Sequence, residues 1–284
     1  MAPHYRVKTR QLDSRVVLTW GHGRAAESWG KPRVGVEAVR AVGVTFGGPL
    51  VLLAATVTAA KSVTRSLITR RTPRMSAVAM LASAVAYEAK GKQWMRSWGS
   101  TKDEMDRSYL GDEHVPEPGV EITQAITIEA PVADVWPWLA QLGQDRGGFY
   151  SYEWLENLAG CRMTNADQIH LDWQKREIGE EVVLHPLNGL RVTVFEPGRA
   201  LGLEGWGLFL LEPIDDERTR FIARGRIPKG AATLFYEGLF ELPHFIMQRR
   251  MLLGIKTRAE ALYAEDQAQY KHQTRSDRDP DAGL

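Results

Sequence analysis

Cysteine is nearly absent from the sequence: Cys161 is the single one in 284 residues, so no disulfide can form within the chain. This composition fits a reducing compartment. A surplus of charge of one sign is also lacking, because 36 Lys and Arg stand against 35 Asp and Glu, for a net charge of +1. Proteins that bind nucleic acids typically carry a basic surplus. The composition therefore predicts no nucleic-acid partner.

The motifs of the common catalytic and cofactor sites are missing as well. The chain contains no HExxH zinc motif, no CxxC pair, no Walker A loop, no G-x-S-x-G elbow and no GxGxxG after a strand. We therefore expect neither a metal nor a cofactor. The absence of a catalytic set favours a binding protein over an enzyme.

Long apolar runs occur in the first hundred residues only. Residues 1–40 carry eight Lys or Arg against three acids, and we interpret them as a disordered basic arm, with an organelle transit peptide as the alternative. Ala41–Ala60 is an uncharged run of about the length that a helix needs to cross a bilayer. A second apolar run, Met75–Tyr87, is shorter and suits a packed or interfacial helix.

Two interpretations of the helical segment 41–98 stay open. In the first, Ala41–Ala60 enters a membrane. If it spans alone, the basic cluster that follows it favours a C-terminal domain on the cytoplasmic side, whereas if Met75–Tyr87 spans as well, that domain lies outside. In the second, both runs are soluble Ala-rich helices that pack on each other or on the main domain, and the protein is cytoplasmic. Residues 99–119 are polar, with two prolines near their end, and we interpret them as a linker.

The pattern changes at about residue 120. Ile122–Ala130 alternates apolar and polar residues, which predicts a strand with the isoleucines on one face. Pro131 suits the first turn of a helix, and apolar residues follow it at helical spacing. A second helix is predicted over Tyr152–Ala159, with Ser151 as its N-cap. Its apolar face would consist of Trp154, Leu155 and Leu158.

Strand-like segments with polar or glycine-containing turns between them come next. They are Glu181–His185, Gly189–Phe195, Ala200–Glu204, Gly207–Glu212 and Thr219–Ile227. Because no helix separates them, they predict an antiparallel meander. A helical pattern returns at Ala231 and continues to about residue 265, with Pro243 dividing a short helix from a long one. The charged tail, residues 266–284, is predicted to be disordered.

This order of elements predicts an α+β domain over residues 120–265. A bent antiparallel sheet can wrap its concave face around the last helix, and the space between them is a natural ligand cavity. This arrangement is the helix-grip fold.

Four segments resemble the SRPBCC superfamily. They are ITIEAPVADVWPWLAQLGQDRGGFYSYEWLENLAG, NADQIHLDWQ, GLRVTVFEPGRAL and ELPHFIMQRRMLLGIKTRAEAL. The superfamily includes START lipid-transfer domains, pollen-allergen proteins, coenzyme Q-binding proteins and polyketide cyclase/dehydrase proteins. The resemblance covers about half of the chain and implies the helix-grip fold. It also implies a small hydrophobic ligand (a lipid, a quinone or a polyketide-like compound) but no particular reaction, since only some members catalyse.

Aromatic residues are the first candidates for the pocket wall, because they bury a large area and line many apolar sites. Any one of them belongs to the core more often than to a site. The candidates are Trp136, Trp138, Tyr150, Trp154, Trp206, Phe209, Tyr236 and Phe240.

Two histidines are weak candidates for chemistry. His185 ends a short strand, where it either faces the cavity as a polar anchor or proton donor, or lies exposed on an edge strand. His170 stands two residues before Asp172, and the two form either part of an acid/base or metal site or a solvated loop.

Arg224 is the third weak candidate. It shares one face of its strand with Arg220 and Arg226. This face is either solvated or presents an arginine to a ligand carboxylate or phosphate from the cavity wall. Cys161 follows the end of a helix, where the helix dipole disfavours a thiolate, so we interpret it as structural.

Three hypotheses about function follow. The first is the binding or transport of a small hydrophobic ligand. The second is an aromatase/cyclase-type enzyme that positions a polyketide-like chain and uses a His, Tyr or Arg side chain. The third is a membrane-tethered accessory protein with no free cavity.

Overall fold

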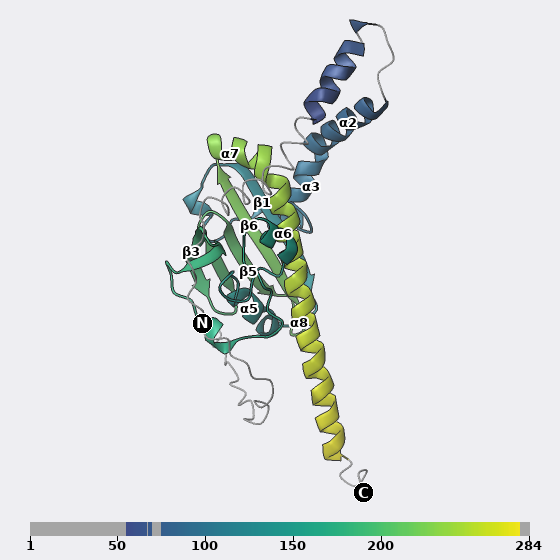
Figure 1. Ribbon diagram of the computed structural model, residues 1–284. Coiled ribbons are helices and arrows are strands. Elements are labelled where there is room, and N and C mark those ends of the chain that lie inside the picture. Colours follow the sequence, from purple (N-terminus) through teal and green to yellow (C-terminus); the bar gives the residue numbers. More distant parts are fainter. Residues whose placement is uncertain (1–54, 67, 70–74, 279–284) are drawn as a thin grey trace. The chain divides into compact units, whose positions relative to one another are not determined.

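The computed structural model describes residues 55–66, 68, 69 and 75–278 (Figure 1). The predicted basic arm and residues 41–54 of the apolar run lie outside the described residues. Within the described ranges, no helix combines the length and the apolar character that crossing a bilayer requires. The membrane association through Ala41–Ala60 therefore stays a prediction.

Six antiparallel strands form one sheet in the order β1-β6-β5-β4-β3-β2. Their bounds are Pro118–Ile128 (β1), Glu181–His185 (β2), Asn188–Glu196 (β3), Ala200–Leu203 (β4), Gly207–Pro213 (β5) and Thr219–Pro228 (β6). The strands from β2 to β6 are successive hairpins, because short turns join them. The first strand then pairs with the last one, which makes β1 an edge of the sheet.

The helices lie before, within and after this meander. Those before it are α2 (Met75–Ala86), the π-helical turn η1 (Tyr87–Gly91), α3 (Lys92–Arg96), α4 (Lys102–Asp106) and the short η2 (Asp112–His114). Between β1 and β2 lie α5 (Val132–Ala140), α6 (Glu153–Leu158) and the short η3 (Leu171–Trp173). After β6 come α7 (Ala231–Phe235), the π-helical turn η4 (Tyr236–Phe240) and α8 (Glu241–Arg278).

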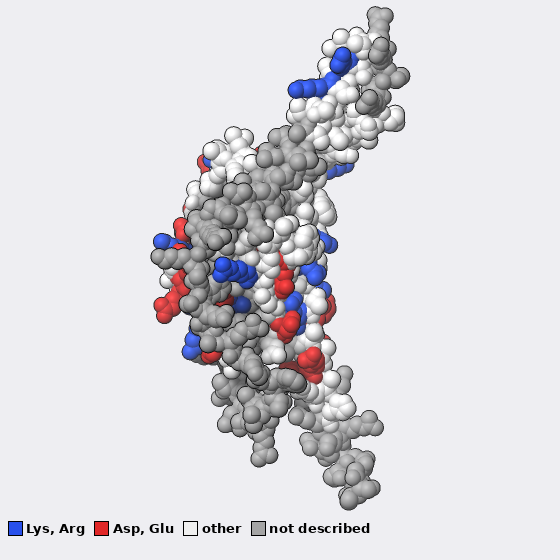
Figure 2. Space-filling view, viewed as in Figure 1, with Lys and Arg blue, Asp and Glu red and all other residues white. Residues whose placement is uncertain are grey.

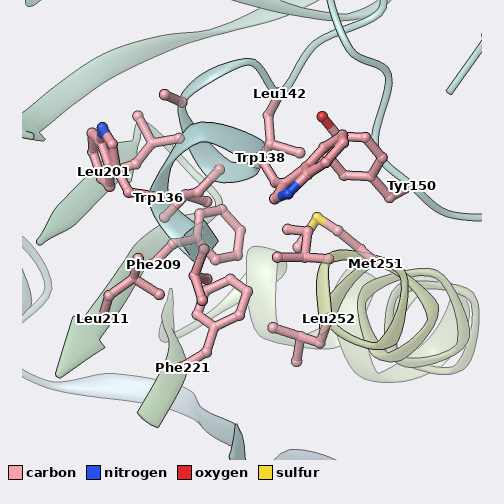
Figure 3. Close-up of a cluster of buried hydrophobic side chains, with 14 of the residues drawn as sticks. Trp136, Trp138, Leu142, Tyr150, Leu201, Phe209, Leu211, Phe221, Met251 and Leu252 are labelled. Carbon is pink, nitrogen blue, oxygen red and sulfur yellow. The ribbon is translucent and has the colours of Figure 1, made fainter. Parts of the chain in front are cut away.

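The long helix α8 runs along the concave face of the sheet, with α5 beside it (Figures 1 and 3). Between them lies the main core, in which Phe209 and Phe221 of the sheet meet Leu139 of α5 and Leu252 of α8. Burying such a side chain stabilises the fold by roughly 1.5–3 kcal/mol. The curved sheet around a C-terminal helix confirms the predicted α+β helix-grip class.

The last helix differs from its predicted bounds at both ends. Pro243 does not divide it, because α7, η4 and α8 follow one another without a break and Pro243 lies within this continuous helical run. The helix changes from α-helical to π-helical hydrogen bonding at η4, just before Pro243. At the other end α8 continues to Arg278, into residues for which the sequence suggested disorder.

The convex face of the sheet is covered by the residues that the sequence suggested as a linker. A capping box of Thr101 and Glu104 starts α4, and Glu104 also binds Arg220 of β6. Further along, Asp112 accepts two hydrogen bonds from Arg224, at 3.1 and 2.9 Å. Tyr109 packs on Ala125, Leu208 and Ile222 of the same face. Residues 99–117 therefore form a layer of the domain.

The edge of β1 is closed by the chain around α3. The amide of Ala125 donates to the carbonyl of Trp98 at 3.0 Å, and the side chain of Gln124 donates to the carbonyl of Met95 at 2.8 Å. Arg96 forms ion pairs with Glu237 and with the buried Glu241. These bonds occupy a strand edge that would otherwise be open to pairing with another chain.

Charged side chains of both signs are interspersed on the described surface that Figure 2 shows. This distribution agrees with the even balance of charge in the sequence.

Candidate functional site

A cavity of about 1100 Å³ lies in the domain, and its wall contains residues from both faces of the sheet. Leu208 and Arg224 belong to the convex face, as their contacts with Tyr109 show, whereas Leu203 and Met251 belong to the concave core. The volume therefore joins an inner chamber under the sheet with an outer groove beside residues 110–115. The two parts meet around the turn between β4 and β5.

The inner chamber is mostly apolar. Its apolar lining consists of Ile122, Phe149, Met163, Leu184, Leu190, Leu203, Trp206, Phe240, Met247 and Met251. Ligand pockets for drug-sized molecules measure roughly 300–1,000 Å³, so even a part of this volume is large enough for one. Methionine side chains adapt their shape to irregular partners, and three of them lie in this wall. The chamber can therefore take an apolar body without a fixed outline.

Three of the eight aromatic candidates line the cavity: Trp206, Tyr236 and Phe240. Trp206 stands in the turn between β4 and β5, where Gly205 and Gly207 have φ angles of 77° and 129° that favour glycine. Its indole N–H donates to Gln248 of α8 at 2.7 Å. This bond fixes the ring across the space between the sheet and α8.

Four other candidates belong to the core (Figure 3). Trp138 meets Tyr150 edge to face, with ring centroids 5.8 Å apart, and Trp136 packs on Phe195. Phe209 is buried among the same side chains. None of the four is among the residues that line the cavity. The eighth candidate, Trp154, is 67% exposed on α6.

The orientation of α6 differs from the prediction. Trp154 and Leu158, which were expected on its apolar face, are exposed, and Glu156 is buried instead. Ser151 does not cap the helix: the N-cap is Tyr152, and the Ser151 hydroxyl donates to the carbonyl of Met247. A helix of six residues has too few apolar positions for its sequence to settle which side faces the core.

Glu156 is the most unusual polar group of the chamber. Its side chain lines the cavity, the residue is only 8% exposed, and its buried Oε2 has no hydrogen-bond partner within the described part of the chain. Burial raises the pKa of this carboxyl to about 7, and the nearby Glu153 adds to the shift. Near neutral pH the group therefore exists in both the protonated and the ionised form.

A second polar group is the pair formed by Tyr236 and His244. The tyrosine hydroxyl lies 3.0 Å from Nδ1 of the imidazole, and both residues line the cavity. Burial lowers the pKa of His244 to about 4, so its ring is neutral at physiological pH. His244 is half-buried. Protein surrounds most of it, and its accessible part faces the cavity.

The three weak candidates for chemistry lie elsewhere. His170 is exposed in a loop and packs on Trp173, with ring centroids 4.0 Å apart. His185 is half-buried at the end of β2, where its Nδ1 accepts a hydrogen bond from the amide of Leu187. Neither histidine is among the residues that line the cavity.

Arg224 is 4% exposed on the convex face, and it borders the outer groove. Its guanidinium binds Asp112, Glu121 and the hydroxyl of Thr123. Because these partners already use its donors, Arg224 is neither solvated nor free for a ligand. Its position indicates that it anchors residues 99–117 to the sheet.

No group of three or more His, Cys, Asp or Glu side chains in the described residues is arranged to hold a metal ion. Cys161 is half-buried, and its pKa is raised to about 11 by burial and by the neighbouring Glu156, which makes the thiol unreactive.

The residues that sequence reasoning missed are Glu156, His244 and Gln248. A charged residue in a short helix and a histidine after a proline are common on protein surfaces, so their local patterns carry no signal of a site. Their shared position under the sheet arises from the docking of α6 and α8, which local patterns do not encode.

No protein-family model matches the sequence, and no curated protein does. Among solved structures, the chain is similar to a Polyketide_cyc-like protein from Corynebacterium glutamicum, determined by NMR in solution, with 17% sequence identity. The match covers 56% of this chain and 97% of that chain, with a TM-score of 0.27. At this level it carries no argument about function, and the fold assignment rests on the pairing and order of the elements described above.

Proposed function

We propose that the protein binds or transports a small, largely apolar molecule in the inner chamber. The observation that carries this proposal is the apolar wall of the inner chamber between the sheet and α8, which is part of a cavity of about 1100 Å³. Each square ångström of apolar ligand surface that leaves water there contributes about 25 cal/mol. A protein without a ligand has no need of a space of this size, since interiors are otherwise closely packed.

The first test is native mass spectrometry of the full chain purified from cells, followed by extraction of any bound compound. A neutral apolar fluorophore, N-phenyl-1-naphthylamine, then reports on binding directly. We expect it to bind in the micromolar range and to gain fluorescence. A protein that carries no passenger and binds no fluorophore would contradict the proposal.

A cavity-filling variant locates the binding. Met247 of α8 lines the cavity, whereas its neighbour Ile246 is 41% exposed and does not. Met247→Trp should weaken fluorophore binding about tenfold or more by occupying the chamber, and Ile246→Trp should leave it unchanged. Equal affinities of the two variants would place the binding outside the chamber.

One observation favours the enzymatic alternative: the Tyr236–His244 pair in the cavity wall. A neutral imidazole next to a hydroxyl can accept a proton from a bound substrate. If the protein is an aromatase/cyclase-type enzyme, it should convert a synthetic poly-β-keto thioester to cyclic products. His244→Gln and Tyr236→Phe should then abolish turnover and retain binding. A loss of binding alone would argue against catalysis.

The accessory-protein hypothesis requires an interior without free space. The cavity argues against that part of it.

A further inference from the structure

Glu156 is a buried carboxyl group without a hydrogen-bond partner among the described residues. More than nine-tenths of the residue is buried, its side chain lines the cavity, and its buried Oε2 lacks a hydrogen-bond partner. Leaving such a group unsatisfied costs roughly 1–3 kcal/mol. In a cavity, such a group can take its hydrogen bond from water or from a bound molecule.

The charges around Glu156 limit what that partner can be. Glu153, on the same helix, is acidic, and Cys161, after the helix, has a thiol whose raised pKa keeps it neutral. Across the chamber, His244 and Tyr236 are uncharged at neutral pH. Among the described residues that line the inner chamber there is no Lys or Arg.

We propose that Glu156 hydrogen-bonds the polar head of the bound molecule, and that this head is an uncharged oxygen group, a ketone or an alcohol. The inference rests on the proposed binding function and names the ligand class. A protonated carboxyl both donates and accepts a hydrogen bond, so it can form hydrogen bonds with a ketone or with an alcohol.

Charged heads fit the chamber less well. A carboxylate or phosphate would be buried with no cation to balance it and with a second acid beside it. An amine would ionise Glu156 and bury two charges, and the desolvation of both offsets much of their attraction. An uncharged oxygen group supplies the hydrogen bond that the Glu156 carboxyl lacks, and no charge is buried.

The two uncharged heads differ in their dependence on pH. A ketone only accepts hydrogen bonds, so it needs the protonated form of Glu156, whereas an alcohol can also donate to the ionised form. A bound ketone raises the pKa of Glu156 further. Its affinity is therefore highest well below pH 7 and falls as the pH rises through and above about 7.

The experiment measures displacement of N-phenyl-1-naphthylamine from the full chain by four compounds with ten carbons each: 2-decanone, 1-decanol, decanoate and decylamine. At about pH 6 the ketone and the alcohol should each bind about tenfold more tightly than the acid and the amine. Raising the pH to about 8.5 should weaken ketone binding about tenfold and alcohol binding by less.

Two substitutions at Glu156 test the role of the side chain. Glu156→Gln keeps a donor, so ketone binding should persist and lose its pH dependence. Glu156→Leu removes the donor, so the preference for uncharged oxygen heads should disappear while the fluorophore still binds. Glu265→Gln, an exposed acid on α8, is the matched control and should behave as the wild type.

The outcomes separate this inference from the proposed function. If the fluorophore does not bind at all, the proposed function fails. If it binds but the Glu156 variants show the wild-type preference, the inference alone is overturned. Tighter binding of the amine or the acid would overturn it too, and so would the failure of all four compounds to displace the fluorophore, because an anchored head should hold at least one of them.

Discussion

At the scale of single residues, Glu156 makes the stability of the fold depend on pH. Its pKa is about 7 in the folded protein, against an ordinary value of 4.5, because folding buries the carboxyl. The folded state therefore binds a proton that the unfolded state releases between these two values. Stability is greatest below about pH 4.5 with respect to this group, and it is lost as the pH rises through about 7.

The variant Glu156→Gln should remove this dependence. The raised pKa corresponds to a loss of about 3 kcal/mol between pH 4.5 and 8, at 1.36 kcal/mol for each pH unit. Near pH 4.5 we expect the variant and the wild type to have similar free energies of unfolding in urea. At pH 8 the variant should be more stable than the wild type by up to about 3 kcal/mol. Glu265→Gln is the control, and the same pH slope in all three proteins would contradict the assignment.

The residues of the site were the least predictable part of the molecule. Three of the aromatic residues expected in the wall do line the cavity: Trp206, Tyr236 and Phe240. Others of the same chemistry lie in the core: Trp136, Trp138 and Phe209. An aromatic side chain buries a similar area in either place, so its type does not distinguish them. The distinction depends on where α8 leaves space, which is a property of the assembled fold.

At the scale of elements, strands were predicted well because their signal is local. The alternation in Ile122–Ala130 placed the isoleucines on one face, and the structure pairs Gln124 with Ala223 and Thr123 with Arg224 on opposite faces. The function of the arginine face was not predictable, because its partners Glu104 and Asp112 lie in the short elements α4 and η2, more than a hundred residues before β6.

The Arg224–Asp112 contact should contribute strongly to stability. Arg224→Ala leaves Asp112 buried with its bidentate partner gone, which typically costs about 3–5 kcal/mol. Chemical denaturation measures this loss, and trypsin should cleave after Arg107 faster once the layer is released.

The matched control is Arg199→Ala. Arg199 pairs with Glu196 on the surface, where both side chains are largely exposed, so its loss should cost less than about 1 kcal/mol. Equal effects of the two substitutions would show that residues 99–117 are not anchored through Arg224.

At the scale of the whole molecule, the order of the elements was predictable, but the contacts that join the start of the chain to its end were not. The sequence suggested that a domain begins near residue 120. The structure places Met95 in the core and pairs Arg96 with Glu241, which is 1% exposed. Short polar stretches such as residues 99–119 read as linkers because their packing partners lie more than a hundred residues away.

Truncation tests this boundary. Deleting residues 1–74 retains every contact described for α3 and the convex layer, so the remainder should unfold cooperatively. Deleting residues 1–98 removes Arg96 and leaves Glu241 buried without its cation, at a cost of about 3 kcal/mol or more. We expect a clear fall in the melting temperature for the second deletion only, and equal melting temperatures would show that α3 is dispensable.

The pairing of Arg96 with Glu241 also has a consequence during synthesis. The two residues are 145 positions apart, and β1 likewise has no partner strand until β6 has been made. At about 5–20 residues per second, a ribosome needs roughly 7–30 s to make the intervening chain. For most of that interval the nascent chain presents an unpaired β1 and the apolar side chain of Met95. This is therefore the period in which we expect a chaperone to bind the chain.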